Sequence, residues 1–102
     1  MKIITVCGSL KFKDEMMKIS EKVELQGNCV ITPIYPTRQN KDDYTEEEFK
    51  IFNKVHKEKI KISDAILVVN VDNYIGSSTA SEIEFAKSLN KEIIYYTDII
   101  ND

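Results

Sequence analysis

The sequence contains few of the residues that build metal sites, disulfide frameworks and glycine-rich phosphate loops. Its 102 residues include two cysteines, one histidine, three glycines, two prolines and no tryptophan. Neither Cys7 nor Cys29 belongs to a CxxC pair, and a single histidine with two separated cysteines lacks the spacing of a zinc site. Both cysteines fall in predicted strands, so we expect buried free thiols in a reducing compartment and no metal site.

A basic excess and a long apolar run are also missing. The formal net charge is −3, whereas a large nucleic-acid interface needs a basic face. The apolar run that follows Met1 and Lys2 is too short for a signal peptide or a membrane span. We therefore expect a cytoplasmic protein with neither a nucleic-acid polymer nor a membrane as partner. The length and the 42% hydrophobic content predict one globular domain, residues 1–102.

The apolar pattern alternates short strands with helices. Strand-like runs rich in β-branched residues occupy 3–7, 29–32, 65–71 and 92–96. Between the first two, Phe12, Met16, Ile19 and Val23 form one helical face, and Gly27 is expected to end that helix. The order β-α-β-α-β-α-β with right-handed crossovers predicts a flavodoxin-like or Rossmann-like α/β three-layer sandwich. Its parallel sheet would have four strands in the order 2-1-3-4.

The second predicted helix begins at a capping-box pattern, Thr45 to Glu48, and follows a loop over 34–44 that could cover a pocket. One apolar stripe of this helix contains Phe49, Phe52, His56 and Ile60, and a lone histidine in such a stripe is more often structural than catalytic. The third helix is expected over about 79–89, with Ile83, Ala86 and Leu89 facing inward.

Two polar loops should meet between the first and third strands, where ligands bind in such sheets. The first loop contains Gly8, Ser9, Leu10 and Lys11, and the second runs over 72–78. Neither loop has the GxGxxG or GxxxxGK[ST] pattern of standard nucleotide sites. Gly8 and Ser9 could equally form a tight turn, and the small residues at 76–79 could simply cap a helix. Asp72, at the end of the third strand, is a pocket candidate by its position.

Glu82 has two readings that the spacing leaves open. With Thr79 it completes a capping box, in which its carboxylate would only hold the start of the helix. It also shares a helical face with Ala86 and Leu89, which would direct it toward the sheet and the crevice.

Two segments together resemble the nucleoside 2-deoxyribosyltransferase superfamily, which includes 2'-deoxynucleoside 5'-phosphate N-hydrolases. They are Cys7-Gly8-Ser9-Leu10-Lys11 and Ser78-Thr79-Ala80-Ser81-Glu82-Ile83-Glu84-Phe85-Ala86. The resemblance extends over residues 3–96 and is greatest to short bacterial and phage proteins described as deoxyribosyltransferase-like.

The resemblance implies a role for each matching position. Glu82 matches the family's nucleophile, which attacks the anomeric carbon of a deoxyribose and releases the base, as in a retaining glycosidase. Ser9, Leu10 and Lys11 match positions that help hold a 5'-phosphate, and Gly76 and Ser78 match small residues that also contact it.

The chain departs from the family at three points. His56 stands where the family has an aspartate that pairs with the nucleophile and helps protonate the leaving base. Thr5 stands where a tyrosine is common, and the sequence ends near the fourth strand, without the segment that completes a neighbouring subunit's site in the transferases.

These observations lead to one leading hypothesis and two alternatives. The leading hypothesis is an enzyme that cleaves or transfers the N-glycosidic bond of a 2'-deoxynucleoside or its 5'-monophosphate. Glu82 and His56 would be catalytic, Asp72 would contact the sugar or base, and Gly8 would help hold the sugar-phosphate end. No metal or cofactor is required, and a homodimer or higher homo-oligomer is expected. The alternatives are a non-catalytic nucleotide- or nucleoside-binding module of the same fold and an interaction domain without a small ligand.

Overall fold

Short runs of isoleucine, valine and leucine form one parallel sheet. The structure is a computed structural model, and it describes residues 1–100. The strands are β1 (Ile3–Cys7), β2 (Cys29–Ile31), β3 (Ala65–Val68) and β4 (Glu92–Tyr95). All pairings are parallel and the order is β2-β1-β3-β4. The predicted α/β fold and the strand order 2-1-3-4 are confirmed.

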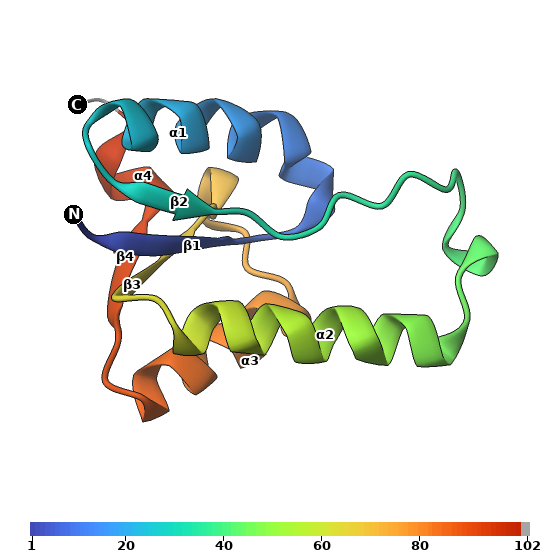
Figure 1. Ribbon diagram of the computed structural model, residues 1–102. Helices are drawn as coiled ribbons and strands as arrows, with labels where there is room; N and C mark the ends of the chain where they lie inside the picture. The colour runs from blue at the N-terminus through green and yellow to red at the C-terminus, as the bar shows by residue number, and fades with distance from the viewer. Residues whose placement is uncertain (101–102) are drawn as a thin grey trace.

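Helices cover both faces of the sheet, as Figure 1 shows. On one face lie α1 (Lys13–Leu25), the short 3₁₀ helix η1 (Leu10–Phe12) that precedes it, and α4 (Tyr96–Ile99). On the other face lie α2 (Glu46–Lys61) and α3 (Ser77–Ser88). This arrangement buries both sides of the two central strands, which explains why their sequences are continuously apolar.

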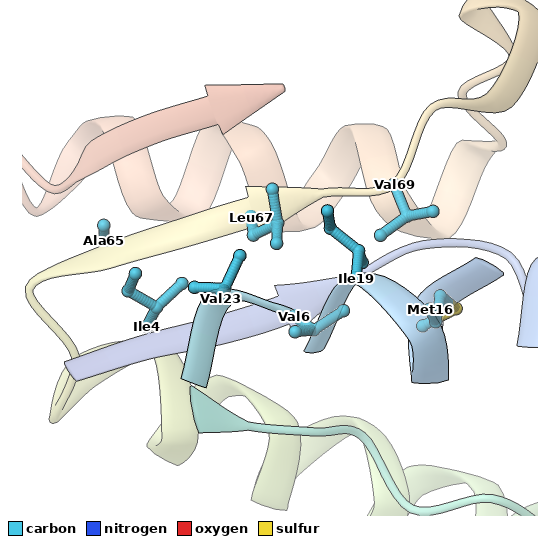
Figure 2. Close-up of a cluster of buried hydrophobic side chains, with 8 residues drawn as sticks. All are labelled: Ile4, Val6, Met16, Ile19, Val23, Ala65, Leu67 and Val69. Atoms are coloured by element: carbon cyan, nitrogen blue, oxygen red, sulfur yellow. The ribbon is translucent and has the colours of Figure 1, made fainter. Parts of the chain in front are cut away.

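Each face of the sheet has its own apolar cluster. Figure 2 shows that the first joins side chains of β1, β3 and the segment after it to α1: Ile4, Val6, Met16, Ile19, Val23, Ala65, Leu67 and Val69. The second joins the opposite sides of β1 and β3 to α2 and α3: Cys7, Ile60, Ile66, Val68, Ile83 and Ala86. The predicted helical face of Met16, Ile19 and Val23 is thus buried, and the second cluster anchors α2 and α3 against the other face of the sheet.

Local signals define several helix ends. Gly27 adopts φ +97° immediately after the C-cap of α1, a conformation that glycine reaches without steric cost. At the start of α2, the Thr45 hydroxyl oxygen accepts a hydrogen bond from Glu48 N at 3.1 Å, and Glu48 Oε1 accepts one from Thr45 N at 2.9 Å. The predicted helix stop and capping box are confirmed.

The start of α3 differs from the prediction. The helix begins at Ser77, and its N-cap is Gly76, which makes no side-chain capping bond. Thr79 therefore lies inside the first turn and is 4% exposed. The predicted capping box between Thr79 and Glu82 does not form, because packing of the helix against the sheet takes Thr79 into the interior. The capping interpretation of Glu82 is wrong.

Three smaller predictions are also corrected. Cys29 is exposed, because it lies on the edge strand β2, whereas Cys7 on the central strand is buried. Leu89 is 39% exposed, because α3 ends before it. The third strand ends at Val68, and the chain then forms a short 3₁₀ helix, η3 (Val71–Asn73), in which Asp72 has φ +53°.

The connection between β2 and α2 extends beyond the carboxyl ends of the strands (Figure 1). It contains the 3₁₀ helix η2 (Lys41–Asp43) and is fastened to α2 by Arg38, whose Nη1 donates hydrogen bonds to Glu48 Oε1 and Asp43 O, both at 2.9 Å. No helix within residues 1–100 has the length and apolar character needed to cross a membrane.

Candidate active site

A cavity of about 420 Å³ opens at the carboxyl end of the sheet, between α2, the start of α3 and the connection that follows β2. Its volume is in the range of small-molecule sites. Most of its wall is apolar. The lining residues are Gly8, Leu10, Pro33, Ile34, Pro36, Phe49, Ile51, Phe52, Asn53, Val55, His56, Lys59, Ser78 and Glu82.

Three elements bring Cys7, His56 and Glu82 together beside this cavity. Cys7 ends β1, His56 lies on α2 and Glu82 lies on α3, one turn beyond the helix start. His56 Nε2 is 3.6 Å from Glu82 Oε1 and 3.3 Å from Cys7 Sγ. The side chains of His56 and Glu82 are only 12% and 18% exposed, and Cys7 is fully buried. The carboxylate and the imidazole therefore face each other in a largely dry setting.

This setting changes the protonation of all three groups. Burial raises the pKa of Glu82 to about 7, although hydrogen bonds with the side chains of Cys7 and Ser78 act in the opposite direction. Burial lowers the pKa of His56 to about 4, and the positive charge of Lys59 adds to this effect. Burial, together with Glu82, raises the pKa of the Cys7 thiol well above its usual value. Each shift follows from the cost of placing a charge in a low dielectric.

The histidine and the carboxyl group together hold one proton between about pH 4 and about pH 7. Two interacting groups at this distance titrate as a pair, so the proton belongs to the pair and not to either residue. With one proton bound, the pair has two forms. In the neutral form Glu82 is a carboxylic acid and His56 is a neutral imidazole. Transfer of the proton from Glu82 to His56 gives a carboxylate and an imidazolium. His56 Nδ1 is buried and has no hydrogen-bond partner among residues 1–100.

Five of the residues proposed for the site from the sequence line the cavity: Gly8, Leu10, His56, Ser78 and Glu82. Gly8 lies close to the chain after β3, since a Cβ there would be 3.2 Å from Val69 O, so a larger residue would force the loop outward. The first loop and the start of α3 thus converge, as the expected position of the crevice requires.

The other four proposed residues, Ser9, Lys11, Asp72 and Gly76, are not in the cavity wall. The Ser9 hydroxyl caps η1 by accepting a hydrogen bond from Lys11 N at 3.4 Å. Lys11 Nζ lies 3.3 Å from the centre of the Tyr74 ring, which links the two loops through a cation–π contact. Asp72 is exposed. Their roles in holding a sugar or phosphate remain predictions.

Sequence reasoning missed the part of the cavity wall that α2 supplies beyond His56. Phe49 and Phe52 were placed on one apolar stripe of this helix without a role in the site, yet they and Val55 line the cavity from α2. His56 lies in the same stripe as Phe49 and Phe52. Because His56 was already a candidate for the site, its neighbours on that stripe could have been proposed as lining residues too. The loop over 34–44, expected to cover a pocket, does contribute Ile34 and Pro36. Cys7 was expected to be buried, and its contact with His56 was not foreseen.

Comparisons with known proteins give a likeness in structure but none in sequence. No protein-family model matches the sequence, and no curated protein matches it. Among solved structures, a 2-desoxiribosyltransferase from Leishmania mexicana superposes with a TM-score of 0.67 over 94% of this chain, at 14% sequence identity. The chain spans 64% of that protein's length. The structural likeness therefore shows that this chain has the fold of a deoxyribosyltransferase.

Proposed function

We propose that the protein cleaves or transfers the N-glycosidic bond of a 2'-deoxynucleoside or its 5'-monophosphate, with Glu82 as the nucleophile. The observation that carries the proposal is the position of the Glu82 carboxyl group. It is not used to cap α3, it lines the cavity, and it faces the imidazole of His56 at 3.6 Å. The likeness in fold to a deoxyribosyltransferase supports the same chemistry.

The shared proton defines how the first step proceeds. In the carboxylate–imidazolium form of the pair, a Glu82 oxygen attacks C1' of the deoxyribose and the bond from C1' to the base nitrogen breaks. The bonding electron pair passes to the base, which takes up the proton that His56 delivers. The products are a glycosyl ester of Glu82, a free base and a neutral His56.

The second step restores the pair. Water attacks C1' of the glycosyl ester, neutral His56 accepts the proton, and Glu82 leaves as a carboxylate, so the pair again holds one proton. A second base in place of water completes a transfer instead of a hydrolysis. Two displacements at C1' retain its configuration.

The cavity wall suits the base more clearly than it suits a phosphate. Phe49, Phe52 and Pro36 offer flat apolar surfaces. Lys59 is the one lysine or arginine in the wall formed by the described residues, and its Nζ donates a hydrogen bond to Thr32 O at 3.0 Å. We therefore include unphosphorylated deoxynucleosides in the test alongside the monophosphates.

The test is incubation of the purified protein with a mixture of 2'-deoxynucleosides and their 5'-monophosphates, with and without a free acceptor base, analysed by chromatography. We expect release of free base that falls about 10³-fold or more in Glu82→Gln. Exchange with the acceptor base would identify a transferase. The matched control is Glu84→Gln, because Glu84 lies on the same helix, is exposed and forms an ion pair with Lys87, at 3.6 Å.

A non-catalytic binding module is the second candidate. It is favoured by His56 itself, which stands where the resembled family has an aspartate. No turnover of any compound in the mixture, together with thermal stabilisation by one of them, would establish the binding module and overturn the enzyme. Loss of turnover in both Glu82→Gln and Glu84→Gln would also contradict the role of Glu82.

A further inference from the structure

Cys7, His56 and Glu82 also form a set of potential metal ligands. Cys7 Sγ, a nitrogen of His56 and a carboxylate oxygen of Glu82 all lie within 4.8 Å of one another. The separations are 3.3 Å from Sγ to Nε2 and 3.6 Å from Nε2 to Oε1. The three side chains come from three different elements, β1, α2 and α3, which the buried cluster of Ile60, Val68 and Ile83 holds together.

Two of these separations, from Sγ to Nε2 and from Nε2 to Oε1, match those of atoms that share one tetrahedral zinc ion. Zinc bonds sulfur at about 2.3 Å, histidine nitrogen at about 2.0–2.1 Å and carboxylate oxygen at about 2.0–2.2 Å, so its ligand atoms lie about 3.3–3.6 Å apart. The third pair, the Cys7 sulfur and a Glu82 carboxylate oxygen, lies within 4.8 Å, so a side-chain adjustment is enough for all three to bind one ion. Thiolate, imidazole and carboxylate are also the donors that zinc prefers.

The cluster can supply two negative charges to a divalent cation. The thiol of Cys7 and the carboxyl group of Glu82 are buried near each other, and the nearby positive side chains are Lys57, which acts on Glu82, and Lys59, which acts on His56. A divalent ion would be neutralised by a thiolate and a carboxylate together, with release to solvent of the thiol proton and, below about pH 7, of the proton that His56 and Glu82 share. Three protein ligands leave a fourth position of the zinc for water or another small ligand.

We propose that Cys7, His56 and Glu82 bind one Zn²⁺ ion and that the bound zinc inhibits the enzyme. The binding stands on geometry alone, whereas the inhibition rests on the proposed function. A Glu82 oxygen that donates its lone pair to zinc no longer attacks C1', and a His56 nitrogen bound to zinc no longer delivers a proton. The zinc ion is thus a reversible block on the nucleophile, and a chelator removes it.

Binding is tested with Co²⁺ as a spectroscopic substitute for Zn²⁺, added to metal-free protein. We expect a thiolate-to-cobalt charge-transfer band in the near ultraviolet, saturating at one equivalent, and its loss when Zn²⁺ displaces Co²⁺. The band should disappear in Cys7→Ser and persist in Cys29→Ser, the matched control, because Cys29 is an exposed free thiol away from the cluster. Absence of the band, or its loss in Cys29→Ser, would overturn the site.

A second measurement covers the case in which Cys7→Ser does not fold. Equilibrium dialysis against Zn²⁺, followed by elemental analysis, should give one bound zinc per parent chain. Affinity should be at least about tenfold weaker in His56→Asn and in Glu82→Gln. Equal zinc binding by both variants and the parent would overturn the assignment of the ligands.

The inhibition is tested separately on turnover. One equivalent of Zn²⁺ should abolish release of the base, and a chelator should restore it. If no deoxynucleoside is turned over, the proposed function fails while the cobalt spectrum still tests the site. If turnover exists and the cobalt band forms, but zinc leaves the rate unchanged, the inhibitory role is wrong and the metal site stands.

Discussion

His56 and Glu82 each have their protonation shifted by burial, and the two shifts have opposite signs. Burial raises the pKa of Glu82 to about 7 and lowers the pKa of His56 to about 4. The first proton of the pair is therefore lost near pH 4 and the second near pH 7. The reactive form holds one proton, since Glu82 must be a carboxylate and His56 must be protonated. Below about pH 4 the pair holds two protons, and above about pH 7 it holds none.

For metal-free protein we expect a bell-shaped dependence of kcat/KM on pH, with a rise near pH 4 and a fall near pH 7. The measurement is the initial rate of base release in buffers from pH 3.5 to pH 9, as far as the protein stays folded. A rate that instead rises through pH 7 would mean that Glu82 acts as a carboxylate without proton delivery from His56.

The proton donor itself is tested by His56→Asn. An asparagine retains a polar side chain but has no proton to deliver, so kcat should fall by about 10²–10⁴-fold, the usual contribution of general acid–base catalysis. The falling limb near pH 7 should disappear, and circular dichroism should show an unchanged fold. Asp64→Asn is a control for a polar change at an exposed residue, whose Oδ2 accepts from Ile3 N at 2.8 Å far from the cavity. Equal rates in the parent and His56→Asn would remove His56 from the reaction.

Among the secondary-structure elements, the end of α1 depends on one backbone conformation. Gly27 has φ +97°, and a Cβ added there would meet no atom within 4 Å. The cost of a side chain is therefore conformational and not steric crowding by neighbours.

Gly27→Ala should lower the free energy of unfolding by about 1–2 kcal/mol, measured by urea denaturation. Gly27→Asn should cost less, because asparagine tolerates the left-handed region better than alanine does. An unchanged midpoint for Gly27→Ala would show that the chain can end α1 in another way.

The connection between β2 and α2 forms one wall of the cavity through Pro33, Ile34 and Pro36. Arg38 fastens it to α2 by its contact with Glu48 and stacks over the Tyr44 ring, 4.5 Å from the ring centre. Arg38 thus holds this wall at its far end, beyond the cavity, while Lys59 Nζ holds its near end through Thr32 O at 3.0 Å.

Arg38→Ala should loosen the wall without unfolding the protein. We expect faster proteolytic cleavage within residues 32–45 and a higher KM, with kcat changed little, because the reacting pair lies on α2 and α3. The control is Lys50→Ala, which removes an exposed contact with Glu47 on the same helix, at 3.7 Å. Loss of kcat without a change in KM would contradict a purely positioning role for this segment.

At the scale of the whole molecule, α2 exposes an apolar stripe. Ile51, Val55 and Ile62 are 59%, 48% and 63% exposed and lie on one side of the helix or just after it, and the first two also line the cavity. Exposed apolar groups of this size are common at protein interfaces. They agree with the expectation of a homo-oligomer, which remains a prediction.

Light scattering after size-exclusion chromatography should give at least twice the mass of one 11.8 kDa chain. Ile62→Lys should shift the mass toward that of one chain, and Leu25→Lys, which changes an 81% exposed residue of α1 on the other face of the sheet, should not. A parent protein of single-chain mass at all concentrations would contradict the oligomer.

Local patterns in the sequence predict the four strands, the three longer helices and their order along the chain, but not the short 3₁₀ helices or α4. The signals that made these predictions possible are local, and the structure contains the feature that each one predicts. They are the short β-branched runs, the spacing of Met16, Ile19 and Val23, the glycine at 27 and the capping box at Thr45. The alternation of strands and helices indicates a parallel sheet with right-handed crossovers, and the order 2-1-3-4 was chosen as a common order of doubly wound sheets.

The start of α3 and the set of residues that form the site depend on packing between distant segments. Thr79 is buried inside the first turn of α3, and the N-cap of the helix is Gly76. Glu82 therefore does not cap the helix. Cys7 and His56 are separated by 49 positions along the chain, and no local pattern relates them to each other or to Glu82. They meet because β1 pairs with β3, and α2 and α3 pack on the same face of that sheet. Contacts between distant segments depend on strand register and helix packing, which no short stretch of sequence encodes.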